Sequence, residues 1–310
     1  MGVAEMDFSD IYLGEKSRYF TGVKGERSPF AAPENTHADL EAIWKECENL
    51  TLEEGVREGS LSWKGIPFRV SLLQSAIEKL FVLRRLPTSA PDISTLGINK
   101  TILNKLLEEG ATGLIVISGT YGSGKTTTAS ALVKARLEKH AGVGVAIEDP
   151  IEVPLEGEVE NGICFQVQVN EAKNETFAFL TKMAARWAPQ IIFLGEIRDG
   201  DSAIEALQAG INGALVICTL HADDVVTSVE RLVRYGSQSK SGDDIHSLIA
   251  MGLHTILHQT LERKNDSDTV NLITEQLFFA GHNGARSLIK QKKATQLVSE
   301  IKLQKNQLLS

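Results

Sequence analysis

One segment of this 310-residue chain has the residue types of a loop that binds phosphate groups. Residues 119–126 read Gly-Thr-Tyr-Gly-Ser-Gly-Lys-Thr, which fits the pattern G-x-x-x-x-G-K-(S/T). Glycines let consecutive backbone N–H groups turn toward a phosphate, and the N-terminus of a following helix adds partial positive charge. Lys125 would reach the β and γ phosphates of a nucleotide, and Thr126 would offer its hydroxyl to Mg²⁺. The predicted nucleotide-contacting residues are Gly119, Thr120, Gly122, Ser123, Gly124, Lys125, Thr126 and Thr127.

Two carboxylates follow short apolar runs and are candidates for catalysis. Glu148 comes directly after Val143–Ile147, and Glu196 is separated from Ile191–Leu194 only by Gly195. Hydrolysis of a nucleoside triphosphate needs carboxylates near the Mg²⁺ and the attacking water. Ligands of open parallel sheets bind at the carboxyl ends of the strands, so both side chains are expected to face the phosphate loop. The alternative for each is a helix cap or a solvated loop end.

A third strand end carries a histidine. His221 follows the apolar run Ala214–Thr219, where its ring could sense a γ-phosphate through a hydrogen bond. Alone it would be read as structural, but beside the other two strand ends it becomes a candidate site residue. Charged neighbours of the two carboxylates are explained equally well as caps and ion pairs: Asp149, Glu152, Arg198 and Asp199.

The elements that must position these residues alternate between strand and helix. Gly113–Ser118 is a continuous apolar run, typical of a buried parallel strand, and a helix is predicted over Thr126–His140 directly after the loop. The same alternation continues through a helix at Thr176–Ala185, which indicates an α/β domain with a parallel sheet. From about Tyr235 onward the pattern is predicted to be mostly helical.

The region before the loop differs in pattern. Asp39–Leu50 has helical periodicity, and residues 60–71 have strand-like stretches around Gly65 and Pro67. A stretch with two prolines and few charges, Leu86–Gly97, is predicted to be a short extended linker. The predicted organisation is therefore a domain over 1–86, a linker over 87–97, an ATPase core over 98–235 and a C-terminal part over 236–310.

Composition and charge exclude several classes of protein. Lys and Arg number 32 against 40 for Asp and Glu, and the resulting net charge of −8 makes direct nucleic-acid binding unexpected. Cys47, Cys164 and Cys218 are far apart and form no C-x-x-C pair, so neither a disulfide framework nor a thiolate zinc site is predicted. Because no apolar run approaches about 18 residues, we expect no membrane span and a cytoplasmic location.

Four motifs, in this order, resemble those of the secretion and pilus ATPases of the type II/type IV secretion superfamily. Walker A reads SGTYGSGKTTT, the Asp box AIEDPIE, Walker B IIFLGEIRD and the His box GALVICTLHADD. The likeness is greatest to the retraction (PilT-type) motors of type IV pili and their relatives in conjugation-type secretion. It extends to both ends of the chain through MDFSDIYLG, GIPFRV, LRRLP and ARSLIKQKKATQL.

The resemblance implies a fold and a function. The fold would be α/β, with a PAS-like α+β N-terminal domain and a RecA-like P-loop NTPase domain that has a helical C-terminal part. The function would be that of an ATP-hydrolysing homo-hexameric ring at the inner face of the bacterial inner membrane, acting on a platform protein during pilus retraction. The alternatives are an energising ATPase of a type IV or conjugation secretion system, or a nucleotide-gated scaffold with weak hydrolysis.

The resemblance also supplies residue roles. Glu148 would orient or deprotonate the attacking water, Glu196 would hold Mg²⁺ together with Thr126, and His221 would contact the γ-phosphate region. Arginines of the N-terminal domain would stabilise transition-state charge, across a subunit interface in this family's arrangement: Arg69, Arg84 and Arg85.

The sequence departs from the family pattern in two places. Gln190 stands where the family has an acid before Walker B, and residues 164–168 lack an arginine that many members carry. Both departures predict the loss of a charged contact and put the catalytic strength in question. The four-cysteine zinc insert of many assembly motors is also absent from the sequence, which favours the short, retraction-like branch.

Overall fold

The computed structural model describes residues 2–50, 58–242, 244–263 and 270–309. Contacts between Cα atoms divide the chain into two compact units. Unit 1 comprises Met1–Ser89 together with the short segment Pro150–Pro154, and unit 2 comprises Ala90–Asp149 and Leu155–Ser310.

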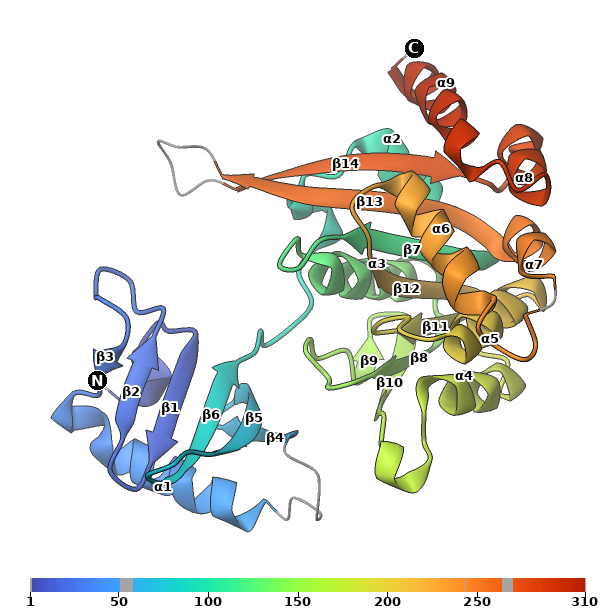
Figure 1. The fold of residues 1–310 in the computed structure, drawn as a ribbon. Helices are drawn as coiled ribbons and strands as arrows, with labels where there is room; N and C mark the ends of the chain where they lie inside the picture. The colour runs from blue at the N-terminus through green and yellow to red at the C-terminus, as the bar shows by residue number, and fades with distance from the viewer. Residues whose placement is uncertain (1, 51–57, 243, 264–269, 310) are drawn as a thin grey trace. The chain divides into compact units, whose positions relative to one another are not determined.

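Unit 1 is built on an antiparallel sheet of six strands in the order β3-β2-β1-β6-β5-β4 (Figure 1). The strands are β1 (Asp10–Gly14), β2 (Arg18–Thr21), β3 (Phe30–Ala31), β4 (Glu58–Trp63), β5 (Ile66–Gln74) and β6 (Lys79–Arg85). Alternate residues of the strands are buried, as a sheet with one covered face requires. On β6, for example, Phe81 and Leu83 are buried while Arg84 is exposed.

The helix α1 (His37–Asn49) packs its apolar stripe into the core of unit 1. Leu40, Ile43 and Cys47 are fully buried, at the spacing of one helix face. This confirms the helix predicted from Asp39 to Leu50, and the α+β character expected of the N-terminal domain is also confirmed. Two short 3-10 helices complete the unit, η1 (Val3–Glu5) and η2 (Glu34–Thr36).

Unit 2 holds an eight-stranded sheet in the order β14-β13-β7-β12-β11-β8-β10-β9. The strands are β7 (Gly113–Gly119), β8 (Gly142–Glu148), β9 (Gly157–Val159), β10 (Gly162–Gln168), β11 (Ile191–Leu194), β12 (Leu215–His221), β13 (Leu253–Arg263) and β14 (Val270–Phe278). The six inner strands are parallel, and each edge strand pairs antiparallel with its neighbour. The parallel sheet predicted from the buried apolar runs is confirmed.

Helices cover the sheet of unit 2 on both faces. They are α2 (Lys100–Leu106), α3 (Lys125–His140), α4 (Phe177–Arg186), α5 (Gly200–Ile211), α6 (Val225–Gly236), α7 (Ile245–Gly252), α8 (Asn283–Lys290) and α9 (Leu297–Leu309), with the 3-10 helices η3 (Ile93–Leu96), η4 (Glu171–Lys173) and η5 (Ala294–Gln296). One core cluster joins α4 to α8 with alternate strand residues such as Leu114 and Val116. Ile115 and Ile117 of the same strand point to the other face, where α3 lies.

The expectation of a mostly helical chain after Tyr235 is wrong for residues 253–263 and 270–278. These residues form β13 and β14, which extend the central sheet beyond β7. His254 and His258 therefore lie on a strand rather than a helix. Burial lowers the pKa of His254 to about 4, and the nearby Arg136 adds to this effect.

At the outer edge of the sheet, one side chain pairs with the backbone of Phe278, the last residue of β14. Gln304 of α9 is buried, and its amide donates to the Phe278 carbonyl and accepts from the Phe278 N–H, both at 2.8 Å. A side-chain amide here makes the pair of hydrogen bonds that a neighbouring strand would make. Gln304 therefore anchors α9 to the sheet.

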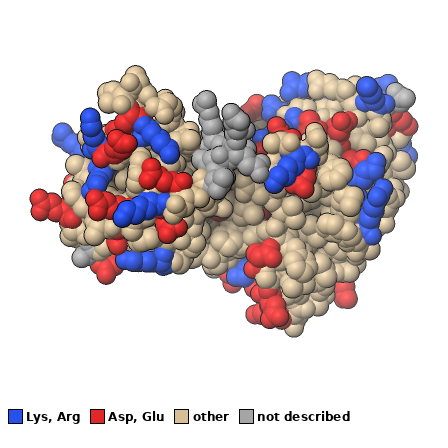
Figure 2. All heavy atoms as spheres, turned by 90° about the horizontal axis from the view of Figure 1, so that it is seen from below, with Lys and Arg blue, Asp and Glu red and all other residues tan. Residues whose placement is uncertain are grey.

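Three further features concern the cysteines, the surface charge and the lengths of the helices. Cys47, Cys164 and Cys218 are buried free thiols, and burial raises the pKa of Cys47 and of Cys164 to about 12. On the face drawn in Figure 2, basic side chains are interspersed among acidic ones. Within the described ranges, no helix combines the length and the apolar character needed to cross a lipid bilayer.

Candidate active site

The predicted phosphate loop connects a buried strand to a helix. β7 is buried along its whole length to Gly119, and α3 begins at Lys125. Gly122 and Gly124 have φ of 72° and 80°, a left-handed conformation that favours glycine. Gly124 is also the residue at the N-terminal cap of α3. The strand–loop–helix arrangement predicted for residues 113–140 is confirmed, and it turns the helix N-terminus toward the loop.

Lys125 is held across the loop. The residue is only 8% exposed, and its Nζ donates a hydrogen bond of 2.7 Å to the backbone carbonyl of Thr120. The same Nζ lies 3.5 Å from Nδ1 of His221. The ammonium group is thus fixed at the mouth of the loop, beside the end of the neighbouring strand β12.

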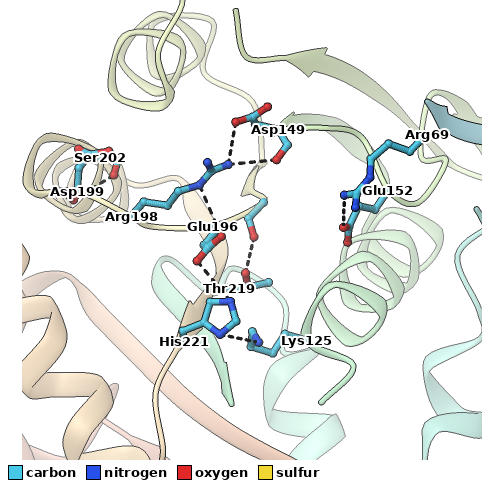
Figure 3. A network of polar contacts seen from close by, with 11 residues as sticks. Arg69, Lys125, Asp149, Glu152, Glu196, Arg198, Asp199, Ser202, Thr219 and His221 are labelled. Carbon is cyan, nitrogen blue, oxygen red and sulfur yellow. Dashed lines mark hydrogen bonds and ion pairs between the residues drawn. The ribbon is translucent and has the colours of Figure 1, made fainter. Parts of the chain in front are cut away.

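Polar and charged side chains from three strand ends continue from Lys125 as a chain of contacts (Figure 3). His221 Nε2 lies 3.6 Å from one carboxylate oxygen of Glu196, and the other oxygen lies 3.6 Å from Nε of Arg198. Arg198 then donates to the Asp149 carboxylate at 2.9 Å and to the Asp149 carbonyl at 3.1 Å. We call these five residues, Lys125, His221, Glu196, Arg198 and Asp149, the strand-end chain.

His221 is placed as a neutral ring. Burial lowers its pKa, the Lys125 ammonium lowers it further, and Glu196 acts in the opposite direction. Nδ1 faces the Lys125 donor and therefore accepts, which leaves the proton on Nε2 toward Glu196. The exposed ring of Tyr121 stacks on His221, with centroids 6.5 Å apart and planes 6° from parallel. Tyr121 belongs to the loop but was not among the predicted contacts.

Glu148 lies at the end of β8 and is 1% exposed. Gln166 of the adjacent strand β10 donates to its carboxylate at 2.7 Å. A Cβ at Gly195 would lie 3.3 Å from both Cα and Cγ of Glu148, so the glycine before Glu196 leaves room for the buried glutamate. On its other side Gly195 accepts a hydrogen bond from the Thr219 hydroxyl.

Sequence reasoning missed Gln166 and Thr219. Both are polar residues within strands, and each contacts a strand end that is distant in sequence: 18 residues for Gln166 and 24 for Thr219. A polar residue in an otherwise apolar run, as Thr219 is in LVICTLH, is the signal that could have found them.

The residues left open between function and structure are engaged as caps and ion pairs. Asp199 caps α5 by accepting from the Ser202 N–H at 2.8 Å. Arg198 pairs with Asp149 within unit 2.

The three predicted arginines belong to unit 1, where each has a partner. Arg69 lies 3.4 Å from Glu152, a residue of the segment that groups with unit 1, and Arg84 lies 2.8 Å from Asp10. Arg85 donates to the carbonyl of Met6 at 2.7 Å and stacks over the ring of Phe8.

Gln190 does not lie at the phosphate loop, where the absence of a catalytic acid would affect hydrolysis. It precedes the first residue of β11, at the amino ends of the parallel strands, whereas the phosphate loop lies at their carboxyl ends. Its side chain accepts from the Val143 N–H at 2.6 Å. Gln190 thus satisfies a backbone N–H group at the amino ends of the strands. Its lack of a charge removes nothing from the strand-end chain.

The donors present fit a Mg²⁺ ion that is held largely by phosphate. Thr126 is a half-buried residue in the first turn of α3, and Glu196 has a partly exposed carboxylate. Mg²⁺ is usually held by one or two protein oxygens, nucleotide phosphates and water. Among the described residues, no group of three or more His, Cys, Asp or Glu side chains could hold a metal ion unaided.

Comparisons with known proteins identify the family. The family model described as "Type II/IV secretion system protein" matches residues 58–308. The type II secretion system protein HxcR of Pseudomonas aeruginosa is 36% identical over 203 residues, which cover 64% of this chain and 40% of HxcR. The uncharacterized protein YggR of Escherichia coli is 32% identical over 259 residues, which cover 82% of this chain and 77% of YggR.

A solved structure agrees over most of the fold. The crystal structure of the pilus retraction motor PilT with bound ADP has a TM-score of 0.78 and 26% identity, and the match covers 97% of this chain and 87% of that one. The chain spans well under half of HxcR and of the type II secretion system protein E of Klebsiella pneumoniae, 40% and 38% of their lengths. Because the family model covers more than half of the chain, this protein belongs to the type II/IV secretion system protein family.

Proposed function

We propose that the chain is an ATP-hydrolysing motor subunit that drives pilus retraction. The observation that carries the proposal is the strand-end chain, in which Lys125 of the phosphate loop is joined through His221 to Glu196. A lysine, a neutral histidine and a carboxylate at the carboxyl ends of parallel strands supply the charge and the hydrogen bonds that phosphoryl transfer needs.

Each residue has a role in this proposal. The loop N–H groups and Lys125 bind the β and γ phosphates, and His221 senses the γ phosphate through Lys125, from which its Nδ1 accepts. Gln166 holds the Glu148 carboxylate in one orientation, which is what a water-orienting group requires. Thr126 and Glu196 would hold Mg²⁺, which neutralises phosphate charge when bound.

Retraction is supported by the likeness to one solved structure, which is 26% identical to this chain. The pilus retraction motor PilT aligns with 97% of this chain, including unit 1. The scaffold alternative depended on the acid missing at Gln190 and on the arginine missing from residues 164–168. The first of these departures lies at the amino ends of the parallel strands, away from the phosphate loop. An energising role in a type IV or conjugation secretion system is the remaining alternative.

The working form in this proposal is a homo-hexameric ring at the inner face of the bacterial inner membrane, acting on a platform protein. Arg84 and Arg85 act on ATP held by a neighbouring subunit. Subunits with Lys125→Ala are mixed with subunits carrying Arg84→Ala and Arg85→Ala, and ATP turnover is measured. Each parent should be inactive, and mixed rings should regain part of the activity, because some interfaces then hold both groups. Absence of recovery in verified mixed rings contradicts action across the interface.

The cellular role is tested with the Lys125→Ala chain in place of the native one. Loss of a retraction motor leaves pili extended, so the number of surface pili should rise. A fall in surface pili would indicate an assembly motor. Unchanged pili with impaired export or conjugation would indicate a secretion ATPase.

A further inference from the structure

The strand β13 brings one buried side chain against the phosphate loop. β13 runs parallel to β7, with His258 opposite Ser118, so that Gln259 reaches the level of Gly119. The Gln259 side chain has no exposed surface, and its Nε2 donates to the Ser123 carbonyl at 2.5 Å. The residue that holds the middle of the loop thus comes from a strand 136 residues later in the chain.

The loop is packed closely around this residue at both ends. A Cβ at Gly119 would lie 2.4 Å from the backbone carbonyl oxygen of Gln259, and a Cβ at Gly124 would lie 3.4 Å from Gln259 Nε2. The first distance leaves no room for any side chain. Gln259 therefore faces the start, the middle and the end of the loop.

The amide has only one acceptable orientation. The opposite orientation would place its oxygen against the carbonyl oxygen of Ser123, so the donor must face the loop. In this orientation Oε1 is one of four buried side-chain atoms among the described residues that lack a hydrogen-bond partner. An unpaired buried amide oxygen costs stability, whereas an apolar residue at this position would avoid that cost. A glutamine that is poor for stability but bonded to the loop points to a role in the site.

The strand that carries Gln259 is itself fixed to β7. Ser118 Oγ lies 3.2 Å from Nδ1 of His258, and Ser228 of α6 donates to Ser118 at 2.8 Å. All three side chains are buried. Gln259 is thus presented to the loop from a rigid support rather than from a loop of its own.

We propose that Gln259 is a positioning residue for nucleotide binding, which fixes the phosphate loop by holding the Ser123 carbonyl. A carbonyl bonded to Gln259 cannot turn toward the bound anion, where it would repel phosphate oxygens. The loop N–H groups then remain directed at the phosphates. The inference rests on the proposed nucleotide site and adds that β13 fixes the conformation of its phosphate loop.

The test uses the full chain and a fluorescent ATP analogue, with Kd measured at pH 6 and pH 8. Gln259→Met removes the donor and should weaken binding about tenfold at both pH values, the equivalent of one hydrogen bond. Gln259→Glu should bind more than tenfold more weakly at pH 8, where a carboxylate faces the Ser123 carbonyl. At pH 6 it should approach the wild type, since burial favours the protonated acid, which can donate.

A matched control is available on the neighbouring strand. Gln276 of β14 is 5% exposed and pairs with Leu257, so Gln276→Glu introduces the same buried acid into the same hairpin. The Kd of Gln276→Glu, divided by the wild-type Kd at the same pH, should be the same at pH 6 and at pH 8. Ratios to the wild type at each pH remove the titration of His221 and His258, which all variants share.

The outcomes separate the two proposals. A wild-type chain that binds the analogue while both Gln259 variants match its affinity overturns the positioning role alone. The same pH-dependent loss in Gln276→Glu overturns it too, because the effect then belongs to the hairpin. A wild-type chain that binds no nucleotide overturns the proposed function together with this inference. Thermal unfolding without nucleotide checks that each variant folds; Gln259→Met is the milder change, since it also removes the unpaired oxygen.

Discussion

Replacing Lys125 by alanine tests the site most directly. Its Nζ is fixed by the Thr120 carbonyl at 2.7 Å, at the loop's mouth, so its charge requires no reorganisation when phosphate binds. Loss of one such preorganised contact lowers turnover by a factor of about 10² or more, equivalent to roughly 3 kcal/mol of transition-state stabilisation.

The fold should survive this change. The lysine stem is buried, and removing about three methylene groups costs roughly 2 kcal/mol, against the 5–15 kcal/mol that stabilises a typical domain. Thr120 is exposed, so its carbonyl can accept from water once the ammonium is gone. Lys134→Ala is the matched control, because Lys134 lies on the same helix and donates to the Ala90 carbonyl instead.

The assay combines steady-state phosphate release with a titration of His221 by NMR. Lys125 is one of the causes that lower the pKa of His221, so this pKa should rise in Lys125→Ala and stay unchanged in Lys134→Ala. Near wild-type phosphate release by folded Lys125→Ala would refute the assignment of the loop as the catalytic site. An unmoved His221 titration would refute the contact between the two side chains.

Three further predictions concern the carboxylates and the pH dependence of stability. Glu148→Gln and Glu196→Gln should both suppress phosphate release and retain ATP binding, with the larger rate loss at Glu148; normal turnover at saturating ATP in a variant with impaired binding would contradict a water-orienting role. Gln166→Leu removes the hydrogen bond to the buried Glu148 carboxylate, worth about 1.5–3 kcal/mol, together with those that Gln166 accepts from the Leu155 and Glu156 N–H groups, and should lower kcat at least tenfold in a folded chain; an unchanged kcat would show that Glu148 needs no such support. Because the pKa of His254 is lowered to about 4, the unfolded chain binds more protons below about pH 6.5, and His254 should cost about 3 kcal/mol of stability between pH 6.5 and pH 4. Urea unfolding of His254→Leu should show that much less acid destabilisation, and an equal loss in both proteins would contradict the assignment.

Much of the parallel sheet was predictable because its strands are short apolar runs that end at chemically distinctive residues. The runs Gly113–Ser118 and Ile191–Leu194 indicate strands, because they are too short for buried helices and are bounded by glycine or polar residues. The strand ends then indicated Glu196 and His221, and the structure brings His221 to Lys125 and Glu196 to His221.

The hairpin of β13 and β14 was missed for a physical reason. Residues 253–259 are buried on both faces, so this stretch shows no alternation of polar and apolar residues. His254 and His258 have a spacing that suits one face of a helix as well as one face of a strand. What selects the strand is pairing with β7, more than 130 residues earlier, and no local pattern records it. Gln259 was overlooked for the same reason.

The amide of Gln304 has a consequence for solubility. An open sheet edge offers unpaired N–H and C=O groups to any other chain, and proteins commonly protect such edges against aggregation. Gln304 occupies both backbone groups of Phe278 at the point where β14 ends. A chain shortened before Gln304, or carrying Gln304→Leu, leaves these two backbone groups of Phe278 without this partner. Attempts to trim α9 for crystallisation should therefore yield protein that self-associates, even though the helix contributes nothing to the proposed site.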